Sequence, residues 1–326
     1  MLSKFFTKLY DIIIFEMKIP ITQSKEWQIL QDDLGEKSIF TKEKDYQYLA
    51  IIKSTPVGNY LYCPYGPIAK ESTSFKAAIK SLDKLAKEHQ AIFIRVEPFE
   101  ERFANSLPKS AQKSTDLNPK ETWLLDLTGN DEEFKQKLPS RLLRYYKQAD
   151  KKGITIKTSH NPNDAHYLLD LQKALAKEKG INTFSEEYYK AQINQPFSTL
   201  YLLEYNNSEA GKKDEIIAAG LVFDDEDTRY NLQGAQTEEG RSLHATGILT
   251  IQLIIDAKKK GLKTFDFWGI APERAPKNHP WAGFTNFKKT FKGEEYDHAG
   301  TYDIVIKPLR YKLYQLTRKL NRLIRK

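Results

Sequence analysis

The sequence predicts an α/β protein with mixed β-sheets flanked by helices, and three observations lead to this prediction. Strand-like and helix-like segments alternate along the chain of 326 residues. The alternation falls into two successive halves with comparable layouts, which suggests a structural duplication. Hydrophobic residues make up 40% of the chain, enough for packed cores and too many for wholesale disorder. We therefore expect two domains, over 17–128 and 129–306.

The first half is predicted to place strands before a helix and further strands after it. Its helix, over 73–89, puts Phe75, Ile79 and Leu82 on one face, and Ser74 can cap its start. The apolar run 91–96 predicts a strand, and the proline-punctuated segment 99–120 predicts a loop. The other expected elements are strands at 17–22, 37–41, 46–53, 58–63 and 123–127 and a helix that opens at Ser24.

The second half repeats this order. A long helix is expected from Asn130 or Asp131 to about residue 150, with Gly153 closing it. The elements that follow are a strand at 153–158, helices at 162–179 and 185–194, strands at 199–206, 215–224 and 228–236, a helix at 243–260 and a strand from Thr264.

The segment 307–326 carries the charge imbalance of the chain. It holds eight basic residues and no acid, which equals the net charge of +8 and leaves 43 basic and 43 acidic residues elsewhere. Leucines recur in it at helical spacing after Pro308, at Leu309, Leu313, Leu316, Leu320 and Leu323. A basic helix with one apolar stripe suits an anionic surface, either a membrane face or an RNA backbone. Alternatively, the helix docks its leucines on the first domain and leaves its charges in solvent.

The cysteine content predicts a reducing compartment, by default the cytoplasm. With Cys63 alone, neither an intramolecular disulfide nor a cysteine-rich zinc site can form. The six histidines are not paired with carboxylates at ligand spacing, so no metal site is expected. No apolar stretch is long enough to span a bilayer, and 5–15 makes a poor signal peptide. A start at Met17 would make 1–16 an extension.

Several common catalytic motifs are missing. The chain has no Gly-x-Ser-x-Gly, no Walker-A loop and no Gly-x-Gly-x-x-Gly, which argues against hydrolase, P-loop and Rossmann readings. The strand, turn and helix over 228–260 match the place where GCN5-related acetyltransferases bind the pyrophosphate of coenzyme A. The turn at 241–247 supplies Arg241 and a late Gly247 but lacks the glycines that such a loop needs.

The segment 264–303 holds more motif-like residues than any other part of the chain, and it carries a family resemblance. It reads Phe265-Asp-Phe-Trp-Gly-Ile, followed by Gly283-Phe-Thr-Asn-Phe-Lys-Lys-Thr-Phe-Lys-Gly. This resembles the FemABX family of peptidoglycan-bridge aminoacyltransferases, which carry Phe-Asp-Phe-x-Gly-Ile and then Gly-x-x-x-Phe-Lys-x-x-Phe-Gly-Gly. Weaker landmarks are Gln23-Ser-x-x-Trp27, Tyr65-Gly-Pro-Ile and the basic helix after Leu138.

The resemblance implies two tandem GCN5-like (GNAT-like) domains and an activity. That activity is transfer of an amino acid from aminoacyl-tRNA, the donor substrate, to the stem-peptide amine of lipid II or UDP-MurNAc-pentapeptide. No cofactor is expected. The implied setting is the cytoplasm, and the basic segment 307–326 then has two candidate anionic partners, the tRNA and the inner face of the membrane that holds the lipid precursor. Three departures are visible: Phe184 replaces the arginine of the family's Arg-x-x-x-Tyr, Lys292 replaces a glycine, and no coiled-coil insertion is present.

Aminolysis of an ester requires deprotonation of the amine, stabilisation of a tetrahedral oxyanion and protonation of the leaving hydroxyl. By family analogy Lys288, preceded by Phe287, stabilises the transition state electrostatically. The alternative is an ordinary surface lysine in a Lys-Lys pair. Glu97 is predicted to orient or deprotonate the amine, and the alternative there is a solvated strand-end carboxylate. No covalent intermediate on the enzyme is needed.

The remaining candidates are substrate contacts and supporting residues. Tyr230 and Tyr188 are predicted to contact the phosphate or sugar of the precursor, with packing as the alternative. Arg141 and Arg144, three apart on one helix face, are predicted to bind phosphates, with a solvated face as the alternative. Further candidates for substrate binding are Arg95, Tyr65 and Lys289, and for structural support Asp266, which holds the turn after its strand, and Gly269.

Two other function classes remain open. An acyl-CoA-dependent N-acyltransferase is disfavoured by the missing glycines of the pyrophosphate loop. A non-catalytic RNA- or membrane-binding protein is disfavoured because the body of the chain, outside 307–326, is formally neutral.

Overall fold

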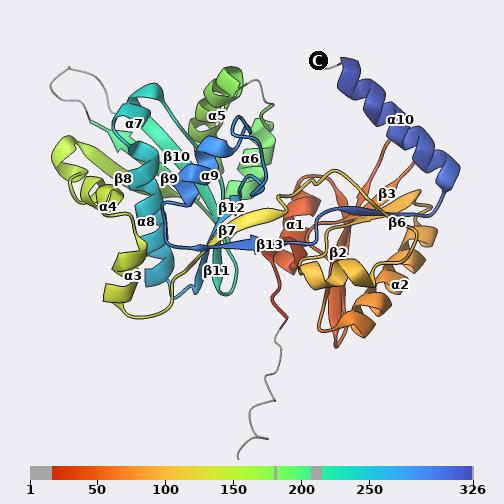
Figure 1. The fold of residues 1–326 in the computed structure, drawn as a ribbon. Coiled ribbons are helices and arrows are strands. Elements are labelled where there is room, and N and C mark those ends of the chain that lie inside the picture. Colours follow the sequence, from red (N-terminus) through yellow and green to blue (C-terminus); the bar gives the residue numbers. More distant parts are fainter. Residues whose placement is uncertain (1–16, 180–181, 207–214, 325–326) are drawn as a thin grey trace, which may run out of the picture. The chain divides into compact units, whose positions relative to one another are not determined.

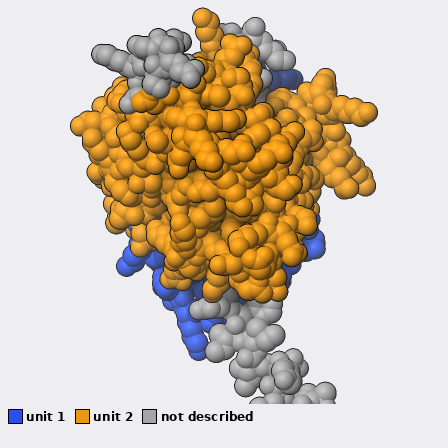
Figure 2. All heavy atoms as spheres, turned by 90° about the vertical axis from the view of Figure 1, so that its left-hand side faces the viewer, with its two compact units in different colours: residues 1–25, 38–114, 301–326 blue, residues 26–37, 115–300 orange. Residues whose placement is uncertain are grey.

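The computed structural model describes residues 17–179, 182–206 and 215–324, and they form two compact units (Figure 1). Of these residues, unit 1 takes 17–25, 38–114 and 301–324, and unit 2 takes 26–37 and 115–300 (blue and orange in Figure 2). Each unit contains one mixed β-sheet flanked by helices. The predicted fold class is confirmed.

Unit 1 is built on a sheet with the strand order β1-β2-β3-β5-β14-β6, and β4 pairs with β2. Strands β3 and β5 run parallel and are joined by helix α2, which packs its apolar face on the sheet. The elements are η1 (Ile21–Gln23), β1 (Lys37–Lys42), β2 (Tyr46–Lys53), β3 (Tyr60–Cys63), β4 (Ile68–Ala69), α2 (Ser72–Glu88), β5 (Phe93–Val96), η2 (Glu101–Ser106), β6 (Ala111–Lys113), β14 (Tyr302–Val305) and α10 (Pro308–Ile324).

Unit 2 is built on a sheet with the order β13-β7-β12-β11-β10-β9-β8. Strands β11 and β12 run parallel and are joined through α8, whose buried leucines and isoleucines form the core with α3, α4 and the sheet. The elements are α1 (Lys25–Asp33), β7 (Glu121–Asp126), α3 (Asp131–Lys137), α4 (Ser140–Lys147), η3 (Asp150–Lys152), β8 (Ile154–Ser159), η4 (Pro162–Asp164), α5 (Ala165–Lys179), α6 (Glu186–Ile193), β9 (Ser198–Tyr205), β10 (Glu215–Asp224), β11 (Thr228–Gln236), α7 (Glu238–Ser242), α8 (Ala245–Lys259), β12 (Thr264–Gly269), α9 (Ala282–Lys288) and β13 (Glu294–Asp297).

The two sheets share one plan, as the predicted duplication requires. In each, a parallel pair is joined by a helix, and the second strand of that pair has an antiparallel neighbour from a distant part of the chain. In unit 1 this neighbour is β14, which pairs with β5, and in unit 2 it is β7, which pairs with β12. The units therefore differ from the predicted ranges 17–128 and 129–306, because each sheet receives a strand from beyond its range.

Several local predictions were wrong, and each has a physical reason. The long helix expected to reach residue 150 is divided into α3 and α4, because Pro139 lacks the N–H that a helix interior uses. The cap of α2 is Glu71, with Ser74 as the reciprocal partner of a capping box. The helix expected over 243–260 is present as α8, which begins two residues later than predicted because its N-cap, His244, has a φ of 60°. The segment expected as a strand at 17–22 ends in the short helix η1.

Helix α10 packs on unit 1 through tyrosines. Tyr311 and Tyr314 are buried against Phe93, so the alternative in which the leucines dock is wrong. The predicted extension 1–16, the terminal residues 325–326 and the side chain of Leu323 lie outside the described residues. Across 17–179, 182–206 and 215–324, no helix has the length and apolar character that crossing a membrane would need.

Candidate active site

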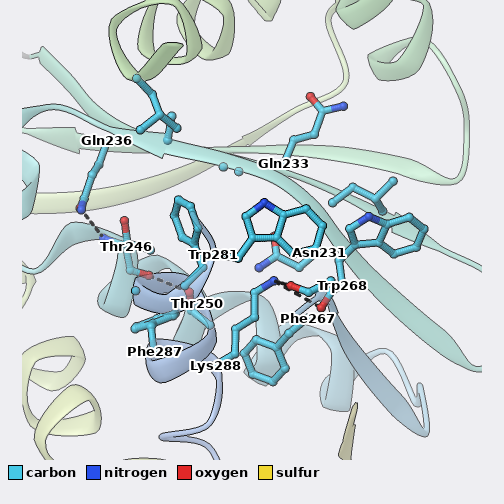
Figure 3. A pocket seen from close by; sticks show the side chains of 18 of the residues that line it. Asn231, Gln233, Gln236, Thr246, Thr250, Phe267, Trp268, Trp281, Phe287 and Lys288 are labelled. Carbon is cyan, nitrogen blue, oxygen red and sulfur yellow. Dashed lines mark hydrogen bonds between the residues drawn. The ribbon is translucent and has the colours of Figure 1, made fainter. Parts of the chain in front are cut away.

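A cavity opens where the two parallel strands of unit 2 separate. Strands β11 and β12 are in register from Thr228 to Tyr230, which pairs with Asp266. Beyond that point β11 continues along β10, and β12 continues beside β7. The space between them is a cavity of about 870 Å³, lined by side chains of α5, β11, α8, β12 and α9 (Figure 3).

The end of β12 forms one wall through a strained turn. Trp268 has a φ of 64°, and the carboxylate of Asp266 accepts hydrogen bonds from its backbone N–H (2.7 Å) and from the hydroxyl of Thr122. Gly269 follows, where an added Cβ would lie 2.5 Å from Cγ of Pro119. The turn directs the carbonyl oxygens of Trp268 and Gly269 toward Lys288.

Lys288, the last residue of α9, projects into the cavity (Figure 3). Its Nζ donates hydrogen bonds to the carbonyl oxygens of Gly269 (2.6 Å) and Trp268 (3.3 Å). Burial lowers the pKa of Lys288 to about 8, while the negative charge of Asp266 acts in the opposite direction. A cation held in this way is directed at a low-dielectric space, so it is not the ordinary surface lysine of the alternative reading.

Aromatic side chains form the walls beside Lys288. Phe287 lines the cavity and packs edge-on against buried Phe291. Trp281 and Phe284 also line it, yet 41% and 49% of their respective surfaces are exposed. The sequence analysis gave no role to these two residues, although both belong to the motif-rich segment 264–303. A ring that is half exposed at a cavity mouth offers a face on which a ligand can stack.

Polar side chains line the opposite wall from β11 and α8. Asn231, Gln233 and Thr250 line the cavity. Asn231 lies on the side of Lys288, whereas Gln233 points away from Lys288 on the other side of β11 (Figure 3). Gln233 donates from Nε2 to Oε1 of buried Gln192 (3.0 Å). The Oε1 atom of Gln233 is buried and has no partner among the described residues, which leaves an acceptor for a ligand. Sequence reasoning missed these residues because no motif surrounds them.

Side chains and backbone of the protein itself occupy the start of α8. The N–H of Thr246 donates to Oε1 of Gln236 (3.1 Å). Gly240 lies so close to the carbonyl oxygen of Ile217 that no Cβ would fit, and a Cβ on Gly247 would meet Leu142 at 2.7 Å. Gly240 and Gly247 therefore allow close packing. They do not form a loop whose backbone N–H groups are open to a ligand. In the part of the chain that the structure describes, no three His, Cys, Asp or Glu side chains gather as a metal site requires.

Other candidates from unit 2 lie outside the cavity lining. Tyr230 is 3% exposed and donates its hydroxyl to Asp225 (2.6 Å), with its ring edge-on to Trp268. Tyr188 stacks on Phe184, and burial raises its pKa to about 12. The other three are exposed: Arg141 and Arg144 on α4, and Lys289, which pairs with Glu295.

The candidates from unit 1 are buried and bonded within that unit. Arg95 is 1% exposed and forms a two-point ion pair with Asp303 (2.7 Å each), so its guanidinium is engaged in the fold. Glu97 is 2% exposed and accepts from Tyr62 and Thr301 (2.8 Å each), so the reading as a solvated carboxylate is wrong. Tyr65 is buried with a φ of 47°.

We expect Gly269→Ala to destabilise unit 2 and to weaken the site. The added methyl would overlap the rigid ring of Pro119, and overpacking of this kind costs about 1–3 kcal/mol. Thermal unfolding measures the loss. Gly283→Ala is the matched control, since this second cavity glycine has no atom within 4 Å of a Cβ. Equal melting temperatures for the two variants would contradict the expected clash.

Comparison with known proteins identifies relatives in sequence and in fold. Residues 192–319 match the model of the FemAB family. The chain is similar to the crystal structure of FemX, with a TM-score of 0.76, 16% identity and coverage of 90% of this chain and 94% of that chain. It is also similar to the structure of L-PGS from Bacillus licheniformis, with a TM-score of 0.56, 14% identity and coverage of 94% and 99%. No curated protein matches the sequence significantly.

Proposed function

We propose, from the match of residues 192–319 to the model of the FemAB family, that this protein is an aminoacyltransferase of peptidoglycan cross-bridge synthesis. In this proposal it moves an amino acid from aminoacyl-tRNA to the stem-peptide amine of lipid II or UDP-MurNAc-pentapeptide. The observation that carries the proposal is the ammonium group of Lys288, half-buried at the wall of a cavity of about 870 Å³.

The side chains of the cavity suit direct aminolysis of an ester. Direct attack by the amine of the precursor uses no nucleophile from the protein, and the described lining contains no serine, cysteine or histidine. The amine of the precursor forms the new C–N bond at the ester carbonyl, and the C–O bond to the ribose breaks. The nitrogen gives up its proton, and the ribose oxygen leaves as a hydroxyl. Lys288 stabilises the oxyanion that forms between these steps.

The aromatic mouth of the cavity suits the end of a nucleic acid. Trp281 and Phe284 expose ring faces beside Lys288, and base stacking on an aromatic ring contributes about 1–3 kcal/mol per base. The terminal adenosine of a charged tRNA would bring its ester next to such a ring. The occupied start of α8 weighs against the acyl-CoA alternative, because a pyrophosphate would compete with Gln236 for Thr246.

The test is transfer of radiolabelled amino acids from a total charged-tRNA pool to lipid II or UDP-MurNAc-pentapeptide. Label transfer that is sensitive to ribonuclease would support the proposal and identify the amino acid. Consumption of acetyl-CoA with no label transfer would replace it with the acyl-CoA activity. Binding of tRNA without turnover of either donor would indicate a non-catalytic protein.

The pH dependence of kcat/KM should show the pKa of Lys288. Below pH 8 the rate should rise with pH, because more of the acceptor amine is deprotonated while Lys288 keeps its charge. Above about pH 8 Lys288 loses its proton, so its lost charge should cancel that rise and the profile should become level. Lys288→Arg should keep rising there, since arginine stays protonated. Single-turnover rates on intact donor, corrected for ester hydrolysis, provide the measurement. A profile that keeps rising in the parent would argue against a titrating Lys288.

A further inference from the structure

Helix α10 has two apolar faces on opposite sides of its axis. A helix turns about 100° per residue, which places Leu309, Leu313, Leu316 and Leu320 in one stripe. The same geometry places Tyr311 and Tyr314 on the other side. One of these faces packs on unit 1, and the other needs an explanation.

The tyrosine face holds the helix in place. Tyr311 donates its hydroxyl to Asp303 on β14 (2.8 Å), and its ring meets Phe93 edge-on at 5.2 Å. Tyr314 lies 4.9 Å from the same ring, and both tyrosines are about 95% buried. The helix therefore cannot rotate to bury its leucines without breaking these contacts.

The leucine stripe is exposed as a consequence. The exposed fractions of Leu309, Leu313, Leu316 and Leu320 are 83%, 48%, 53% and 49%. Four large apolar side chains in a row form a continuous patch, and such patches on a soluble surface indicate a binding face.

Basic residues flank this stripe on both sides. On the helical wheel Arg310 lies on one flank, and Lys312 and Lys319 lie on the other. All three are exposed, and no acidic residue occurs anywhere in 307–326. The pattern places an apolar centre between two positive borders.

We propose that α10 is an interfacial helix that lies on an anionic lipid bilayer. Leucines that point into the acyl boundary, with lysine and arginine at the level of the phosphates, match both the apolar and the charged parts of this surface. An RNA backbone would use the charges and leave the leucines in water. A second copy of α10 would bury the leucines but bring like charges together on both borders. The inference does not rest on the proposed transferase activity.

The experiment measures binding of the 326-residue protein to vesicles of phosphatidylglycerol and phosphatidylcholine by co-sedimentation. We expect binding to anionic vesicles and little to pure phosphatidylcholine. Leu313→Gln/Leu316→Gln should weaken binding by on the order of tenfold, because binding scales with buried apolar area. Arg310→Gln/Lys312→Gln/Lys319→Gln should lose the preference for anionic vesicles.

The matched control is Ile29→Gln, which removes an equally exposed apolar side chain (56%) from α1. It should bind vesicles as the parent does, and unchanged melting temperatures would show that all variants fold. Leucine variants that bind vesicles like the parent would overturn the proposal. So would a charge variant that keeps its vesicle binding and loses only tRNA binding in a separate filter-binding measurement. A dimer, detected by gel filtration, that dissociates in the leucine variant while neither protein binds vesicles would also overturn it. The assay contains no tRNA or precursor, so its failure and a failure of the transfer assay are distinguishable.

Discussion

Replacing Lys288 by methionine is expected to lower the turnover number by about 10² to 10³, the usual effect of removing one preorganised stabiliser of an oxyanion. Methionine keeps the length and apolar stem of lysine but removes the ammonium that Gly269 and Trp268 hold in place. The Michaelis constant should change little, because the charge acts on the transition state and not on the bound substrates. Steady-state rates of label transfer from aminoacyl-tRNA to the precursor measure both quantities.

Lys292→Met provides the control for this variant. Lys292 is an exposed lysine four residues further along the chain and is absent from the cavity lining. Its replacement removes the same charge from the same region without touching the cavity, so turnover should stay near that of the parent. Equal losses in the two variants would indicate a general effect of basic charge on tRNA binding and would contradict the proposed role of Lys288.

Asp303→Asn is expected to lower the stability of unit 1 by about 3–5 kcal/mol, the usual cost of breaking a buried ion pair. Asp303 on β14 accepts two hydrogen bonds from the guanidinium of Arg95 on β5 and one from Tyr311. Burial by itself disfavours the charge of Arg95, and the hydrogen bonds and charge of Asp303 reverse this and raise its pKa. Without the carboxylate, a buried cation would lack a counter-charge. Urea unfolding followed by circular dichroism measures the loss.

Asp83→Asn is the control for the ion pair. It removes a carboxylate from α2 in the same unit, where Asp83 pairs with Lys87 on an exposed helix face. Exposed pairs of this kind contribute little, so this variant should unfold close to the parent. A double variant, Arg95→Met/Asp303→Leu, should recover part of the stability because it removes both charges together. Failure of the double variant to improve on Asp303→Asn would indicate that packing around the pair, and not the unpaired charge, sets the loss.

The elements that could be predicted from the sequence are those long enough to show a pattern of apolar residues. Helix α2 is an example, since its apolar side chains recur at the helical spacing. Strand β2 was predicted from a different signal, a continuous apolar run of strand length that is buried on both faces. Strands β6, β13 and β14 were not predicted, because segments of three or four residues carry too little pattern. Their pairing is set by partners far along the chain, and no local signal encodes it.

The candidate site was predicted in part, for a similar reason. The family motif located Lys288 and Gly269, which lie together at the end of β12. Gln233 was missed because a strand residue becomes part of a cavity only when its neighbouring strand diverges. The solvent-exposed reading of Glu97 failed because a strand end indicates solvent only when nothing packs over it. Here Thr301, just before β14, donates a hydrogen bond to that carboxylate.

The interleaving of strands between the two units sets an order for folding during synthesis. Strand β14 lies between β5 and β6, so the sheet of unit 1 stays open until residue 305 has been made. The sheet of unit 2 already has its last strand at residue 297. Although its first strands leave the ribosome first, unit 1 is therefore completed last. Until then, β5 presents an unpaired edge on the nascent chain, where chaperones or other chains can bind.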